Sequence, residues 1–174
     1  MPKDRKPTIS LAQARDAMAH VYKLDGYGFF TVESAKNHQP VFRATLTSAL
    51  IELNEVLKFL AASGQRIDCK GDDIQPVLNE GDLTSLIAAC RNAACHLDSN
   101  HRHVESRRSF VLSASWNLVF GRGPPPIGGE SIIAMPSSPF DDDWAVYMGG
   151  IRLLMVRNFR CAVNKADVAL KAMR

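Results

Sequence analysis

The sequence lacks any apolar run close to the roughly 18 residues that a membrane-spanning helix requires. Its first ten residues, MPKDRKPTIS, carry charges but not the apolar core of a secretory signal peptide. There are only four cysteines, and three of them lie in apolar stretches where a free thiol behaves as a small hydrophobe. We therefore expect a cytoplasmic protein with free thiols and no membrane association.

A strong charge of one sign is also missing. The 21 Lys and Arg residues against 18 Asp and Glu residues give a net charge of +3, well short of a polybasic nucleic-acid-binding protein. This balance permits RNA or DNA as a partner but does not argue for either. The arginines are unevenly spread, and they gather in two places: Arg102, Arg107 and Arg108, then Arg152, Arg157 and Arg160.

Apolar residues at helical spacing dominate what is present. Hydrophobic residues make up 46% of 174 residues and charged residues 22%, the balance of a soluble chain that forms one domain, residues 1–174. Apolar residues recur every three or four positions in four stretches, which predicts four helices. These run from about Ser10 to Lys23, from near Pro40 to Ser63, from Asp82 to about Leu97, and from about Trp144 to the end. We expect Ser10, Asp82 and the acidic run 141–143 to cap the starts of the first, third and fourth of these helices.

The middle of the chain has a different pattern. Residues 109–120 are rich in residues that favour strands, and 132–134 form a second short apolar run. Residues 121–129 between them are rich in glycine and proline, which indicates a long loop. The fold class we predict is all-α in the main: a four-helix bundle with a small β-hairpin insertion at about 109–135.

The stretch from Arg91 to His96 carries the residues best suited to chemistry. Histidine can move protons near neutral pH. Arginine stays charged and can hold phosphate oxygens with two donors. Asn92 lies one helical turn before His96 and can orient the histidine or the phosphate. These three are the candidate catalytic residues.

Arg91, Asn92 and His96, on the third predicted helix of a small bundle, resemble the motif of the HEPN (higher eukaryotes and prokaryotes nucleotide-binding) family. That motif is an arginine, a polar residue and then a histidine after four to six intervening positions. The resemblance implies a metal-independent endoribonuclease without cofactors, often a toxin or a phage-defence component, that acts on RNA as a homodimer. It also implies an antitoxin or nucleotidyltransferase as a partner.

Two features of the motif depart from a simple match. Residues five apart on a regular helix point about 140° apart, so Arg91 and His96 share a cleft only if the helix frays or a dimer lines the cleft from both sides. Many toxin members carry a tyrosine two residues after the histidine, which a nucleotidyltransferase can modify. Asp98 occupies that position here, which weakens the case for that form of control.

Further residues are candidates for RNA or phosphate binding. They are His101, Arg102 and His103 beside the motif, and Arg157 and Asn158 on the last predicted helix. Trp116 and Phe120 have rings that can stack on bases, although packing in the core of the hairpin is the more usual role. We expect Glu52 and Glu55 to lie on a solvent-exposed face of the second predicted helix, unless one of them is a buried partner of Arg91.

Three other interpretations stay open. Cys95, His96, His101 and His103 suggest a zinc site, but their spacing fits no standard finger, so we expect no metal. A non-catalytic module of the same type would bind RNA, nucleotide or a protein partner without cleaving. A structural helical protein would carry the motif by accident. Cleavage of RNA by the purified protein, lost on substitution of His96, would separate the endoribonuclease from the non-catalytic module and the structural protein.

Overall fold

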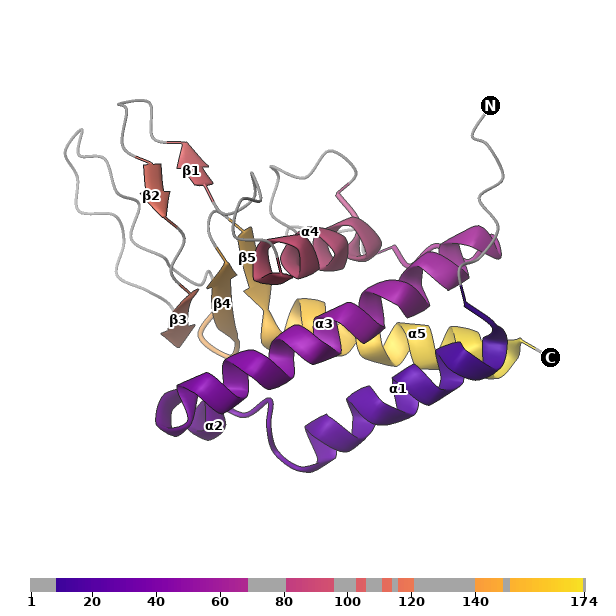
Figure 1. Ribbon diagram of the computed structural model, residues 1–174, viewed down its shortest axis with the longest axis horizontal. Helices are drawn as coiled ribbons and strands as arrows, with labels where there is room; N and C mark the ends of the chain where they lie inside the picture. The colour runs from indigo at the N-terminus through magenta and orange to yellow at the C-terminus, as the bar shows by residue number, and fades with distance from the viewer. Residues whose placement is uncertain are drawn as a thin grey trace.

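The computed structural model describes residues 9–68, 81–95, 103–105, 111–113, 116–120, 140–148 and 151–173. Most of these residues are helical, which confirms the expected mainly α class, and a small antiparallel sheet accompanies the helices (Figure 1). The helices are α1 (Leu11–Gly26), α2 (Val32–Asn37), α3 (Gln39–Ala62), α4 (Leu83–Cys95), the π-helix η2 (Met155–Arg160) and α5 (Cys161–Ala172). The strands are β1 (His103–Glu105), β2 (Val111–Ser113), β3 (Trp116–Phe120), β4 (Trp144–Met148) and β5 (Ile151–Leu154).

Helix α1 begins where its sequence predicts. Ser10 is the N-cap: its hydroxyl accepts the backbone N–H of Gln13 at 3.2 Å, and the Gln13 side chain accepts the backbone N–H of Ser10 at 2.9 Å. This reciprocal pair satisfies two donors that a helix start leaves without partners. Ala14, Met18 and Val21 form the buried face of the helix.

Helix α3 is the centre of the molecule and packs against α1, α2, α4 and α5. The leucines of its predicted stripe are all fully buried: Leu46, Leu50, Leu53, Leu57 and Leu60. Pro40 lies in its first turn, where a missing N–H costs no intrahelical hydrogen bond. The helical spacing of apolar residues therefore predicted this element correctly.

Residues Trp144–Met148 and Ile151–Leu154 are the paired strands β4 and β5, so the prediction of one helix from Trp144 to the end was wrong. Strand β4 is the central strand of the sheet, with Trp144 opposite Phe120 of β3 and Met148 opposite Ile151 of β5. Burial on both faces makes β4 apolar at nearly every position. A short run of that kind shows no period that separates strand from helix. Only η2 and α5 are helical in this part of the chain.

The predicted β insertion covers part of the strand region. Strands β2 and β3 lie inside 109–135, whereas β1, β4 and β5 lie outside it. Strand β3 pairs with β4, and β1 pairs with β2 in a separate two-stranded ribbon. The apolar run 132–134 and the glycine- and proline-rich stretch 121–129 lie outside the described residues.

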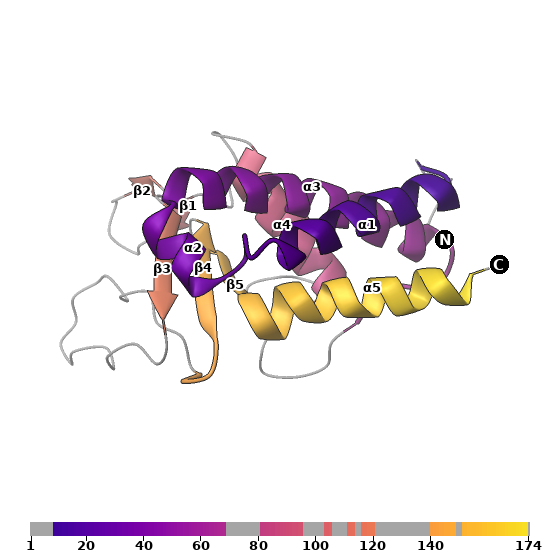
Figure 2. The same ribbon diagram turned by 90° about the horizontal axis from the view of Figure 1, so that it is seen from below.

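The sheet lies at one end of the helical body. Figures 1 and 2 show α1, α3 and α5 side by side, with β3, β4 and β5 near the start of α3. Phe42 of α3 and Trp144 of β4 join the two parts, with ring centroids 5.6 Å apart. At the opposite end, Arg15 donates to the backbone oxygen of Met173 at 2.7 Å, which ties α1 to the end of α5.

Candidate functional site

Helix α4 carries the motif arginine. Its buried face, which includes Leu86, Ile87 and Cys90, packs against α3, and α4 also contacts β4 and β5. This packing fixes the rotation of the helix and leaves Arg91 partly buried at the edge of the packed face. The Arg91 Nη1 atom donates to the side-chain oxygen of Asn92 at 3.0 Å. Arg91 and Asn92 are therefore in contact, whereas the expected role of Asn92 toward the histidine or the phosphate stays a prediction.

The start of α4 is held by Asp82, the cap that the sequence predicted. The Asp82 carboxylate accepts the backbone N–H of Ser85 at 2.7 Å and forms an ion pair with Arg66. Arg66 also donates to the Ser85 hydroxyl at 2.8 Å. Burial alone would raise the pKa of Asp82, but the hydrogen bonds from Arg66 and Ser85 outweigh it and lower that pKa. The helix that presents Arg91 is thus anchored at its first turn.

The rest of the predicted motif lies outside what the structure describes. His96, His101 and Arg102 are outside the described residues, and His103 is placed in β1 by its backbone alone. The approach of His96 to Arg91 therefore stays a prediction, as does the RNA-binding role of His101, Arg102 and His103.

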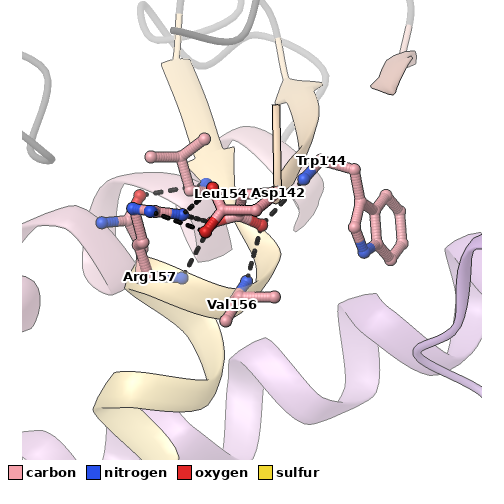
Figure 3. Close-up of polar contacts among 7 residues, drawn as sticks. Asp142, Trp144, Leu154, Val156 and Arg157 are labelled. Atoms are coloured by element: carbon pink, nitrogen blue, oxygen red, sulfur yellow. Dashed lines mark hydrogen bonds and ion pairs between the residues drawn. The ribbon is translucent and has the colours of Figure 1, made fainter. Parts of the chain in front are cut away.

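Arg157 and Asn158 lie in η2 and make structural contacts. Arg157 pairs with Asp142 at 2.9 Å (Figure 3). The pairing lowers the pKa of Asp142, chiefly through the hydrogen bond from Arg157. The Arg157 guanidinium also lies 3.9 Å from the centre of the Phe140 ring. Asn158 is fully buried, and its side-chain oxygen accepts the backbone N–H of Leu154 at 3.0 Å. A phosphate in solvent would not reach Asn158 in this arrangement, so we give Asn158 a structural role.

A buried carboxylate organises the same region. The Asp143 side chain is fully buried and accepts backbone N–H groups from Trp144 at 2.8 Å, Val156 at 2.9 Å and Arg157 at 2.9 Å. Figure 3 shows Val156 and Arg157 at the first turn of the helix, beside Trp144 of β4. The acidic run was predicted to cap a helix that follows it directly. It caps a helix that begins after an intervening hairpin instead.

Sequence reasoning missed one pair with acid–base chemistry. The Nδ1 atom of His20 on α1 lies 2.7 and 2.8 Å from the two carboxylate oxygens of Glu52 on α3. A carboxylate in this position fixes the orientation of the ring. No sequence signal links two residues that are 32 positions apart. Glu52 therefore pairs with a histidine, and Glu55 bonds to Lys58 at 2.9 Å.

Among the described residues, no group of three or more His, Cys, Asp or Glu side chains is arranged to hold a metal ion. None of the described helices has the length and apolar character needed to cross a membrane.

Comparison of the chain with protein-family models, with curated proteins and with solved structures found no match. The resemblance to the HEPN family therefore rests on the motif residues and the order of the helices.

Proposed function

We propose that this chain is a metal-independent endoribonuclease of the HEPN type, built as a four-helix bundle with a β insertion. The observation that carries the proposal is the contact between Arg91 and Asn92 on α4. A partly buried cation held by its neighbour is already oriented before a phosphate arrives. Such preorganisation is what stabilisation of developing negative charge requires.

The proposed reaction is an internal transfer at phosphorus. The 2′-oxygen of one ribose forms a bond to the adjacent phosphorus, and the bond from phosphorus to the 5′-oxygen breaks. His96 takes the proton from the 2′-hydroxyl, and a proton is delivered to the departing 5′-oxygen. Arg91 holds the phosphoryl oxygens as their charge grows, and Asn92 positions Arg91. The products end in a 2′,3′-cyclic phosphate and a 5′-hydroxyl.

The proposal includes a homodimer that brings two motif helices to one cleft. Residues five apart on a regular helix diverge by about 140°, so a second copy supplies the other wall of the site. A toxin or defence role, with an antitoxin or nucleotidyltransferase as partner, belongs to the same proposal. Asp98 in place of the tyrosine that a nucleotidyltransferase modifies weakens the case for control by such an enzyme.

The chemistry of the product ends tests this proposal. The purified protein is incubated with a mixed RNA in the presence of a chelator, and the fragment ends are determined. We expect cyclic phosphate and 5′-hydroxyl ends, with a loss of cleavage in Arg91→Ala of at least about a hundredfold. Cleavage that needs an added divalent ion, or that leaves 3′-hydroxyl ends, would show a different mechanism. RNA binding without cleavage would identify a non-catalytic module instead.

A further inference from the structure

A groove of about 1090 Å³ lies between the end of α2, the first half of α3 and strand β3. Two cations line it, Lys36 and Arg43, and both are exposed. None of the described residues that line it is acidic. Gln39 adds an exposed amide that can donate and accept hydrogen bonds. The described residues at the rim of the groove are therefore polar, and two of them are cationic.

An aromatic ring forms part of the groove wall. Phe120 of β3 is partly exposed there, and the Nζ atom of Lys36 lies 4.5 Å from the centre of its ring. A cation and the flat face of a nucleic acid base are alternative partners for the same aromatic face. Lys36 is a long exposed side chain, so it can leave the ring and keep its charge near a bound anion.

The ring is held in place from behind. Phe120 stacks on Trp144 of β4 with ring centroids 5.7 Å apart and planes 20° apart. Trp144 is almost fully buried and packs in turn on Phe42, which is also buried. These contacts join β3, β4 and α3, so the position of Phe120 does not depend on a ligand. A preformed aromatic face loses little conformational freedom on binding.

We propose that this groove binds a single-stranded segment of RNA, with a base stacked on Phe120 and neighbouring phosphates at Lys36 and Arg43. A ring beside cations is the combination that single-strand binding proteins use, because stacking accepts any base and the cations follow the backbone. A duplex would not fit this chemistry, since its bases are stacked on one another and their faces are covered. The choice of RNA as the ligand rests on the proposed function. The groove's aromatic and cationic residues do not include Arg91 or His96.

The test measures binding without cleavage. A short fluorescent single-stranded RNA with 2′-O-methyl groups lacks the nucleophile, so the full-length protein can be titrated against it by fluorescence anisotropy. The variants are Phe120→Leu, which keeps apolar bulk but removes the ring, and Lys36→Gln. The matched control is Lys58→Gln, which removes the same charge from an exposed site on α3 outside the groove. Thermal melting shows that each variant is folded.

We expect Phe120→Leu to weaken binding about tenfold. Lys36→Gln should weaken it several-fold and lower the slope of log affinity against log salt by about 0.7. Lys58→Gln should bind as the wild type does. Equal effects of Lys36→Gln and Lys58→Gln, wild-type affinity in both groove variants, or no binding of the probe by the wild type would each overturn the proposal. If Phe120→Leu fails to fold, the comparison of the two lysine variants decides.

The outcomes for the groove and for the nuclease can be told apart. Binding that depends on Phe120, in a protein that cleaves no RNA, would support the groove and refute the nuclease. Cleavage that depends on Arg91, together with a binding affinity that Phe120→Leu and Lys36→Gln leave unchanged, would support the nuclease and refute the groove.

Discussion

The carboxylate of Asp143 accepts the backbone N–H of Arg157 at 2.9 Å, although the two residues are 14 positions apart in the chain. The same carboxylate accepts the N–H of Val156. Asp143 directly precedes β4, and it therefore accepts hydrogen bonds from backbone N–H groups in the first turn of η2. The hairpin between these residues is closed by this contact. One buried carboxylate therefore holds the first turn of η2.

Replacement of Asp143 by alanine should destabilise the protein. Three backbone N–H groups would lose their acceptor in a buried setting, and the free energy of unfolding should fall by about 3 kcal/mol. Urea denaturation followed by circular dichroism measures the change. Asp142→Ala is the control, because its side chain is 73% exposed and its pair with Arg157 is a surface contact. A loss in Asp142→Ala as large as that in Asp143→Ala would contradict this account.

The stability of the protein should fall in acid partly through Asp82. Its pKa is lower in the folded chain than its ordinary value of 3.8, so folding favours the ionised form. The stabilisation is complete above that value and is lost as the pH falls through the folded pKa. Asp82→Asn should therefore show a smaller loss of stability than the wild type between about pH 5 and pH 2. Identical pH dependence of the two proteins in urea titrations would rule out this contribution.

The three described cysteines should differ in reactivity. Cys90 is fully buried, and burial raises the pKa of its thiol far above the ordinary value, whereas Cys95 and Cys161 are partly exposed. A thiolate is the reactive form, so Cys90 should resist iodoacetamide until the protein unfolds. Mass spectrometry of digests after brief labelling gives the order in which the cysteines are alkylated. Modification of Cys90 as fast as Cys161 in the folded protein would show that α4 opens readily.

Arg91→Lys should impair RNA cleavage although it preserves the charge. Lysine offers a point charge and cannot hold two phosphate oxygens in one plane, so the rate should fall roughly tenfold or more. Arg15→Lys is the matched control on α1, where the arginine donates to backbone oxygens at the end of α5. Single-turnover rates at saturating enzyme separate this effect from weaker binding. Full activity in Arg91→Lys would mean that Arg91 supplies only charge.

The sequence predicted the helices in which apolar residues keep helical spacing over a long stretch. The leucine stripe of α3 and the Ser10 cap of α1 were both correct because each depends on local spacing. Helix α2 was missed, since six residues are too few to show a period. The segment from Trp144 was assigned to a helix because its burial depends on β3 and β5, which no local pattern reveals.

The sequence predicts that Arg91 and Asn92 lie on one helix, and both lie on α4. Their hydrogen bond joins adjacent residues, whereas the approach of His96 to Arg91 stays a prediction. The His20–Glu52 pair and the contact of Lys36 with Phe120 join residues that are far apart in the chain. The tertiary packing of α1, α2, α3 and β3 brings them together, so spacing alone does not predict them. The longer amphipathic helix that the sequence predicts would expose Asn158, whereas η2 buries it.

The rate of RNA cleavage by the wild type and by His96→Ala, with chelator present, tests the central claim most directly. We expect the wild type to cleave and His96→Ala to be slower by at least about a hundredfold, the usual effect of removing a general acid or base. His20→Ala, which removes the exposed histidine paired with Glu52, should cleave at the wild-type rate. Equal rates for wild type and His96→Ala, cleavage by neither, or loss of cleavage in His20→Ala alone would contradict the assignment of His96.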